Sequence, residues 1–200
     1  KAHPPLRVLD VGTGSGVIAA ALARELPAAQ VFASDREADA LAVARVNLGR
    51  HAPGVALVCG DGLGPFRSGA FDLVVSNPPY CAEGELATLA PEVGRYEPWT
   101  ALAAGPDGLL VLATLVADAA AALRPGGWLV LEMGAGQAEA VRRLVERDGH
   151  YGVPEIVRDG AAYAPTRVED FVVVPEAGEQ VRRLRGAGFV CIVFTNPPGL

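Results

Sequence analysis

Runs of residues that favour β-strands alternate along this chain with runs that favour α-helices, and this alternation restricts the possible folds more than any other feature. In the run 37–48, Leu41, Ala44 and Leu48 fall on one helical face. Strands are predicted at 7–11, 31–34, 55–59, 71–76, 128–132, 155–157 and 170–174, and helices at 17–26, 37–48, 109–123 and 135–147. The alternation indicates an α/β fold, with a mostly parallel twisted sheet and helices on both of its faces.

Composition and charge exclude several classes of protein. Half of the 200 residues are apolar, which is enough for a buried core. The 17 basic and 23 acidic side chains give a net charge of −6, so the chain lacks the positive excess that binds nucleic acids or anionic membranes. The longest apolar run, 109–123, is too short to cross a bilayer. Cys59, Cys81 and Cys191 are far apart, so we predict no disulfide framework and no metal site, and we expect a cytoplasmic protein.

A glycine-rich turn, Asp10-Val-Gly-Thr-Gly-Ser-Gly16, follows the first predicted strand and opens the first helix. Free backbone amides and the positive end of the helix favour ligand binding there, and glycines let a ligand approach the backbone. A dinucleotide loop would carry glycine where Val17 stands, and the lysine of a phosphate-binding loop is absent. The spacing resembles instead the S-adenosylmethionine loop of Rossmann-like methyltransferases. The predicted cofactor contacts in this loop are Gly12, Thr13, Gly14, Ser15 and Gly16.

Three acidic residues stand near the ends of the first three predicted strands, where a cofactor held by the glycine loop would lie. Asp35 is placed to accept hydrogen bonds from both hydroxyls of a ribose. Asp61 is placed to accept from an adenine amino group, and Gly62 leaves room for the ring. Asp10 is placed to attract the cationic amino group of a methionine moiety. Each acid by itself is equally consistent with a solvated loop residue or a helix cap, but their common register supports a cofactor site.

The tetrapeptide Asn77-Pro78-Pro79-Tyr80 follows the predicted strand 71–76. Two prolines fix the backbone, so they set the directions of the Asn77 side-chain amide and the Pro78 carbonyl. A planar NH2 group is a poor nucleophile, and two fixed oxygens that accept its hydrogens can aim its nitrogen at an electrophilic methyl group. The Tyr80 ring offers a flat face for the planar group. We therefore predict that Asn77, Pro78 and Tyr80 are catalytic and that Asn77, Pro78, Pro79 and Tyr80 bind the acceptor.

The tetrapeptide and the glycine loop together resemble two groups of enzymes that methylate planar NH2 groups, the N6-adenine nucleic-acid methyltransferases and the glutamine-N5 protein methyltransferases. Further motifs between residues 6 and 174 resemble the HemK/PrmC release factor glutamine methyltransferases, and they are Glu92-Val-Gly-Arg-Tyr-Glu-Pro98, Gly105-Pro-Asp-Gly-Leu109, Arg124-Pro-Gly-Gly127 and Leu131-Glu-Met-Gly134 with Gln137. The resemblance implies a class I S-adenosylmethionine-dependent methyltransferase with a late antiparallel strand.

This resemblance also implies site residues and a substrate. Gly12–Gly16, Asp35, Gly62 and Asn77 would contact S-adenosylmethionine, and 77–80 would hold the acceptor glutamine, which belongs to the Gly-Gly-Gln motif of class I peptide chain release factors. The segment 92–98 would shape the acceptor's path to the site, and Gln137 is expected to cap or brace its own helix. The implied role is in translation termination.

The domain organisation and the rival functions complete the expectations. We expect a catalytic domain at 1–174, a C-terminal extension at 175–200 and no N-terminal substrate-binding domain before Lys1. One alternative is an N6-adenine methyltransferase acting on RNA or DNA, against which the net charge of −6 argues. The other is a non-catalytic module that binds S-adenosylmethionine, which would have no chemical need for the 77–80 tetrapeptide.

Overall fold

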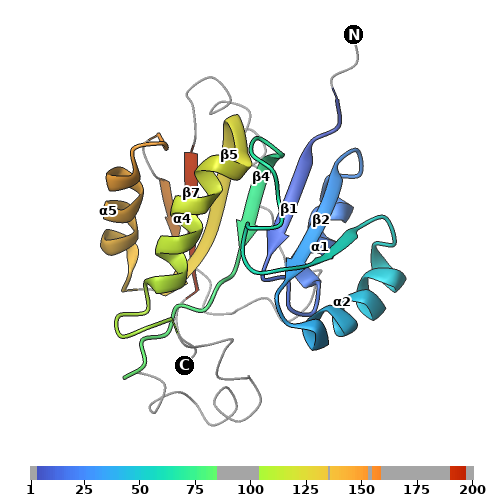
Figure 1. The fold of residues 1–200 in the computed structure, drawn as a ribbon, viewed down its shortest axis with the longest axis horizontal. Helices are drawn as coiled ribbons and strands as arrows, with labels where there is room; N and C mark the ends of the chain where they lie inside the picture. Colours follow the sequence, from blue (N-terminus) through green and yellow to red (C-terminus); the bar gives the residue numbers. More distant parts are fainter. Residues whose placement is uncertain (1–3, 85–103, 135, 153–154, 159–189, 197–200) are drawn as a thin grey trace.

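A computed structural model describes residues 4–84, 104–134, 136–152, 155–158 and 190–196 (Figure 1). Its elements follow the predicted alternation of strands and helices. In chain order they are β1 (Arg7–Val11), α1 (Val17–Glu25), β2 (Gln30–Asp35), α2 (Ala38–His51), β3 (Ala56–Cys59), β4 (Phe71–Ser76), α4 (Leu110–Ala122), β5 (Leu123–Gly134), α5 (Ala138–Asp148), β6 (Glu155–Arg158) and β7 (Val190–Asn196). None of the helices in the described part of the chain is long and apolar enough to cross a membrane.

The strands form a single sheet in the order β3-β2-β1-β4-β5-β7-β6. The chain proceeds from β1 outward to β3, returns to the centre, and then proceeds from β4 in the other direction. Because the direction of winding reverses between β1 and β4, the loops after these two strands diverge and leave a crevice at their carboxyl ends. Such a reversal is the usual ligand site of an open parallel sheet.

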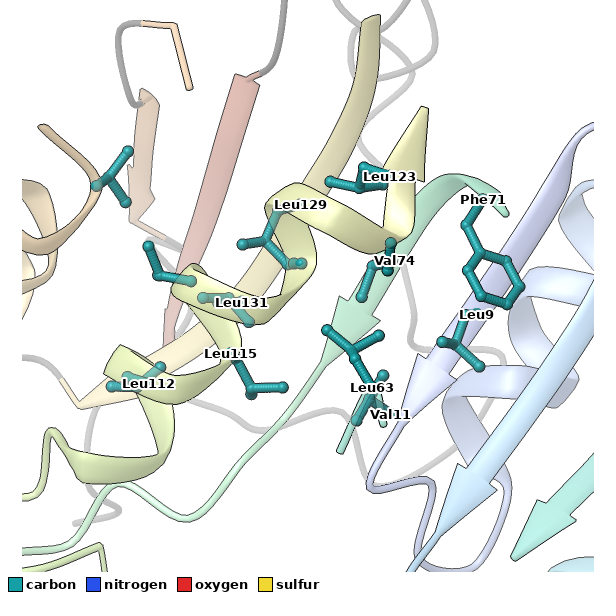
Figure 2. Close-up of a cluster of buried hydrophobic side chains, with 14 of the residues drawn as sticks. Leu9, Val11, Leu63, Phe71, Val74, Leu112, Leu115, Leu123, Leu129 and Leu131 are labelled. Carbon is teal, nitrogen blue, oxygen red and sulfur yellow. The ribbon is translucent and has the colours of Figure 1, made fainter. Parts of the chain in front are cut away.

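Each face of the sheet buries its own apolar cluster. Leu9 and Val11 of β1 pack on the side of α4, together with the fully buried Leu112. Val8, which lies between them in sequence order, points to the opposite face and packs with Ala44 of α2. Figure 2 shows side chains from α4 and from the strands gathered in the first cluster. The two clusters hold the helices against the sheet, so the strand ends have fixed positions.

The amino edge of the sheet carries a polar network that joins its central strands. The buried Asp72 of β4 accepts a hydrogen bond from the backbone N–H of Arg7 in β1, at 2.8 Å. It also forms an ion pair with Arg124 of β5. The Arg7 guanidinium lies over the rings of Phe32 and Phe71, at 5.0 and 5.5 Å from their centroids. These contacts stabilise the sheet at the edge opposite the strand ends that carry the predicted site.

The late strands differ from the sequence prediction. β7 pairs with β5 on one side and with β6 on the other, and both pairings are parallel. An antiparallel strand was expected, but the described sheet contains only parallel pairings; the chain between β6 and β7, 159–189, is longer than the dozen residues that a parallel crossover needs. The predicted strand 170–174 lies outside the described residues. Val190–Asn196, which the sequence analysis assigned to a C-terminal extension, belongs to the sheet.

The fifth strand also starts earlier than predicted. Leu123 pairs with Phe71, and the next pairing joins Trp128 to Leu73, so the register shifts between them. The Arg124-Pro-Gly-Gly127 segment is the part of β5 that is displaced from the ladder. The turn that these residues predict is therefore present as an irregularity inside the strand.

Candidate active site

Strand register brings the predicted site segments to one edge of the sheet. Val11 of β1 pairs with Ser34 of β2 and with Ser76 of β4. Gly12, Asp35 and Asn77 are the next residues along their chains, so they follow the same row at the carboxyl edge. Neighbouring strands are about 4.8 Å apart, so Asn77 follows the strand adjacent to the glycine loop. The Ser76 hydroxyl also donates a buried hydrogen bond of 2.7 Å to the Val11 carbonyl, which fixes the two strand ends together.

The glycine loop has the backbone that its sequence predicts. Gly12, Gly14 and Gly16 have φ values of 69°, 56° and 85°, in the left-handed region that favours glycine. A Cβ added at Gly12 or Gly14 would meet no atom within 4 Å, so both leave open space above the loop. A Cβ at Gly16 would lie 3.1 Å from Leu48 Cγ, so this glycine is needed for packing against α2. Gly12 and Gly14 thus form a cradle that a ligand can approach, whereas Gly16 serves the fold.

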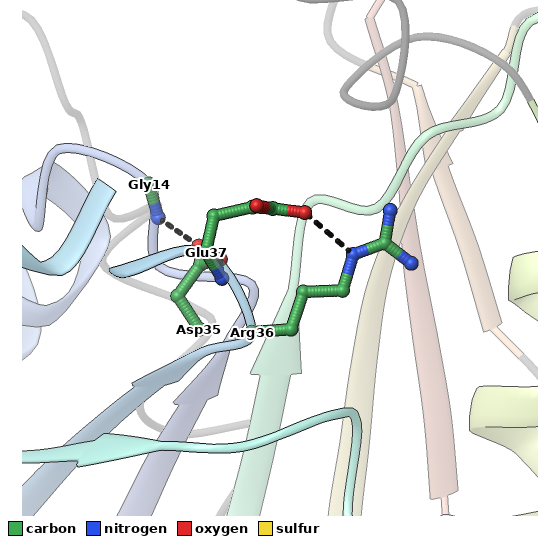
Figure 3. A network of polar contacts seen from close by, with 4 residues as sticks. All are labelled: Gly14, Asp35, Arg36 and Glu37. Atoms are coloured by element: carbon green, nitrogen blue, oxygen red, sulfur yellow. Dashed lines mark hydrogen bonds and ion pairs between the residues drawn. The ribbon is translucent and has the colours of Figure 1, made fainter. Parts of the chain in front are cut away.

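Asp35 is held by the loop that it faces (Figure 3). Its Oδ2 accepts a hydrogen bond of 2.9 Å from the Gly14 N–H, and its Oδ1 accepts one of 2.9 Å from the Glu37 N–H. The carboxylate is half-buried, and each oxygen keeps capacity for a further hydrogen bond. This arrangement fits the two hydroxyls of a ribose. The neighbouring Arg36–Glu37 ion pair is exposed, and such pairs contribute little.

The structure gives Asp10 a different place from the one predicted. Its side chain is fully buried, and its Oδ2 accepts hydrogen bonds from the Thr13 hydroxyl at 2.6 Å and the Ala19 N–H at 3.0 Å. Asp10 therefore supports the loop and the first turn of α1 from below. Burial raises its pKa from 3.8 to about 6, while the two hydrogen bonds act in the opposite direction. Its contact with a methionine amino group stays a prediction, and a carboxylate without exposed surface does not favour it. Thr13 is buried as well, and its hydroxyl is directed to Asp10 rather than outward.

Asp61 and Gly62 lie beyond the end of β3. This strand ends at Cys59, which is paired with Asp35, so Asp61 stands two residues past the sheet edge. Its side chain is exposed. Gly62 has a φ of 51°, and an added Cβ would meet no atom within 4 Å. Both positions are compatible with the flank of an adenine site, and their contacts with the ring stay predictions.

The Asn77–Tyr80 corner combines an exposed amide with a buried turn. Asn77 is exposed, Pro78 is buried, and Pro79 and Tyr80 are half-buried. The Tyr80 hydroxyl donates to Glu132 Oε1 at 3.4 Å. Burial and the Glu132 carboxylate together raise the pKa of Tyr80 above its ordinary value, so the phenol stays protonated. The corner thus presents a polar side chain at the edge and keeps the following ring in a fixed place.

Gln137 has a role that the sequence analysis missed. It is the N-cap residue of α5, but its side chain does not cap that helix. The side-chain nitrogen donates instead to the Tyr80 carbonyl at 2.9 Å and to the Gly108 carbonyl at 3.2 Å. Gln137 thus contacts the segment predicted to bind the acceptor. The only sequence signal was its place after the Leu131–Gly134 motif, which does not disclose a contact so distant along the chain.

Two further residues support the site from neighbouring elements. Asn47 on α2 donates a hydrogen bond of 2.9 Å from its side-chain nitrogen to the Ser15 carbonyl in the glycine loop. Glu132 follows Leu131, the β5 partner of Ser76, so it stands in the same row as Asn77. Among the described residues, no group of three or more histidine, cysteine or acidic side chains could hold a metal ion. The segment 92–98 lies outside the part of the chain that the structure describes.

The parallel sheet, the open glycine loop and the acid after β2 define a Rossmann-like class I S-adenosylmethionine-dependent methyltransferase fold, as predicted. The methyltransferase small domain family matches residues 2–92. A ribosomal protein L11 methylase from Lactobacillus delbrueckii subsp. bulgaricus has a similar fold, with a TM-score of 0.50 and 23% identity over 72% of this chain and 60% of that one.

Sequence comparison gives the particular family. The release factor glutamine methyltransferase of Gloeobacter violaceus is 48% identical over 78% of this chain and 55% of its own length. That of Geobacter sulfurreducens is 47% identical over 71% of this chain and 50% of its own length. Over the stretch that it shares with them, this chain belongs with the release factor glutamine methyltransferases. It spans about half the length of these relatives.

Proposed function

We propose that this chain transfers a methyl group from S-adenosylmethionine to the side-chain amide nitrogen of a protein glutamine. The observation that carries this proposal is the placement of Asn77, an exposed amide on a diproline corner, one strand away from the open glycine loop. The relatives named as release factor glutamine methyltransferases support a glutamine acceptor. We further propose that the acceptor is the glutamine of the Gly-Gly-Gln motif in a class I peptide chain release factor, which places the reaction in the cytoplasm.

The cofactor would be held by the glycine loop and Asp35. When bound, S-adenosylmethionine supplies a methyl group on a positively charged sulfur. The open space above Gly12 and Gly14 leaves their backbone accessible, and the Asp35 carboxylate would accept hydrogen bonds from the ribose hydroxyls. The backbone amides of Gly14 and Glu37 already fix that carboxylate, so little reorganisation is needed when the nucleoside binds. Asp61 and Gly62 would flank the adenine.

Asn77 and Pro78 would act on the acceptor amide. The nitrogen of an amide is a poor nucleophile because its lone pair is delocalised into the carbonyl. The Asn77 Oδ1 and the Pro78 carbonyl would each accept one of its two hydrogens, and so aim the nitrogen. As nitrogen loses its planarity these hydrogens become more acidic, so fixed acceptors bind the transition state better than the ground state. One of the two protons leaves when the methylamide forms. Tyr80, held neutral beside Glu132, would stack on the acceptor amide.

A methyl-transfer assay with alternative acceptors tests the proposal. The chain is incubated with methyl-labelled S-adenosylmethionine and, in separate reactions, with a class I release factor, the same factor with its motif glutamine replaced by alanine, and an adenine-containing RNA. We expect label only in the unaltered factor. Label in the RNA would support an N6-adenine methyltransferase instead. Cofactor binding by calorimetry without transfer to either acceptor would support a module that binds S-adenosylmethionine without turnover.

A further inference from the structure

Gln137 stands at a junction of three segments that meet behind the Asn77–Tyr80 corner. Its amide hydrogens are donated to the Tyr80 carbonyl and to the Gly108 carbonyl, at 2.9 and 3.2 Å. Its Oε1 accepts a hydrogen bond of 2.9 Å from the backbone N–H of Gly134, at the end of β5. All three contacts join Gln137 to segments outside α5. A primary amide offers two donors and an acceptor at one place, and this junction uses both kinds of group.

The packing around Gln137 leaves little freedom for movement. A Cβ added at Gly108, whose φ is 73°, would clash with the Tyr80 carbonyl oxygen and with Gln137 Nε2. The backbone of Gly108 is therefore in direct contact with the residues that it supports. Two further backbone hydrogen bonds lie beside the junction, from Ala104 N–H to the Cys81 carbonyl at 3.0 Å and from Glu83 N–H to the Gly105 carbonyl at 3.1 Å. The chain after Tyr80 is thus tied to the chain before α4.

These contacts fix the far end of the Asn77–Tyr80 corner. Its near end is fixed by the hydrogen bond of 2.7 Å from the Ser76 hydroxyl to the Val11 carbonyl. Between these two anchors, Pro78 and Pro79 hold their φ angles close to one value. A corner with two anchored ends and two rigid residues has few ways to rotate. The direction of the Asn77 side chain and of the Pro78 carbonyl therefore depends on whether Tyr80 is held.

We propose that Gln137 is a positioning residue for methyl transfer, which acts through the Tyr80 carbonyl to aim the Asn77 and Pro78 oxygens at the acceptor amide. The inference rests on the proposed function, since it takes the acceptor to be a planar NH2 group held by these oxygens. Gln137 itself does not touch the acceptor. Its loss would leave the glycine loop and Asp35 in place, so the effect falls on turnover and not on cofactor affinity.

Kinetics of Gln137→Ala and Gln137→Glu test this role. A displacement of about 1 Å at a reacting group costs on the order of 10²-fold in rate, so we expect Gln137→Ala to lower kcat by about that factor. The dissociation constant of S-adenosylhomocysteine, measured by calorimetry, should stay unchanged. Gln30 lies exposed at the start of β2, at the opposite edge of the sheet. Gln30→Ala and Gln30→Glu are the matched controls, and both should keep the kcat of the wild type.

Gln137→Glu gives a readout that a purely structural role would not produce. Ionised glutamate would direct an oxygen with no hydrogen at the Tyr80 and Gly108 carbonyls, whereas protonated glutamate can donate to one of them. We therefore expect the ratio of kcat in Gln137→Glu to kcat in the wild type to rise as the pH falls through the pKa of the new carboxyl. Gln30→Glu should show no such rise. Free energies of unfolding, measured in urea at each pH, separate this rescue from a change in stability.

A measurement without an acceptor separates this inference from the proposed function. The NMR signals of the Asn77 side-chain amide should move with pH in Gln137→Glu and stay constant in the wild type over the same range. If the wild type methylates no release factor, the proposed function fails while this titration still tests the brace. Unchanged kcat in Gln137→Ala, a flat pH ratio with unmoved Asn77 signals, or a loss of cofactor affinity equal to the loss of kcat would each overturn the inference.

Discussion

The buried carboxyl of Asp10 predicts an unusual dependence of stability on pH. Its pKa is raised from 3.8 to about 6 in the folded protein, chiefly by burial. Between these two values the unfolded chain has already lost the proton that the folded chain still holds, so unfolding becomes easier as the pH rises. The contribution is complete below pH 4 and is lost above pH 6. A difference of about 2 pH units at 1.36 kcal/mol per unit is about 3 kcal/mol.

Asp10→Asn removes this titration and keeps a side chain of the same shape. The free energy of unfolding of the variant minus that of the wild type should therefore increase by about 3 kcal/mol between pH 4 and pH 7. Urea unfolding, followed by the fluorescence of the buried Trp128, measures both proteins at each pH. Asp61→Asn is the control, because Asp61 is exposed and the same difference should stay flat. A flat or falling difference for Asp10→Asn would refute the reasoning.

Four further substitutions test the site and the fold. Asn77→Ala should lower kcat by about 10²- to 10³-fold, the usual loss for one fixed hydrogen-bonding group, while S-adenosylhomocysteine affinity changes little; equal kcat would remove Asn77 from the chemistry. Asp35→Ala should weaken S-adenosylhomocysteine binding in calorimetry by about 10- to 100-fold, through lost charge-assisted hydrogen bonds, and an unaltered dissociation constant would contradict the ribose contact. Leu112→Ala should lower the free energy of unfolding in urea by roughly 2–5 kcal/mol, since the side chain is fully buried. Asp72→Ala should lower it by roughly 2 kcal/mol, because the Arg7 N–H loses its acceptor, and a change near zero would show that this network does not stabilise the sheet.

Much of the fold could be predicted because its signals are local. The strand 7–11, the glycine turn and the helix that follows are encoded by neighbouring residues, and the structure confirms all three. The strand register then follows from a rule that parallel strands share, so Gly12, Asp35 and Asn77 meet at one edge as their positions after strands implied. Chain order and residue type were sufficient for these predictions.

The failures involve contacts between segments distant in sequence. Asp10 follows the strand rule, but the loop folds over it, and nothing local shows that Thr13 and Ala19 would bind its oxygen. The side chain of Gln137 leaves its own helix because carbonyls from two remote segments are closer partners. The position of β7 beside β5 depends on tertiary pairing as well. Sequence patterns predict which edge carries the chemistry, whereas the supporting contacts require the folded chain.

The Arg7–Asp72–Arg124 network has a practical consequence for engineering. It lies at the amino edge of the sheet, while the loops that would handle ligands leave from the carboxyl edge. A strand length of six residues in β4 separates Asp72 from the corner that follows Ser76. Thermal tolerance can therefore be adjusted by substitutions at one end of the strands while acceptor preference is redesigned at the other, with little interference between the two efforts.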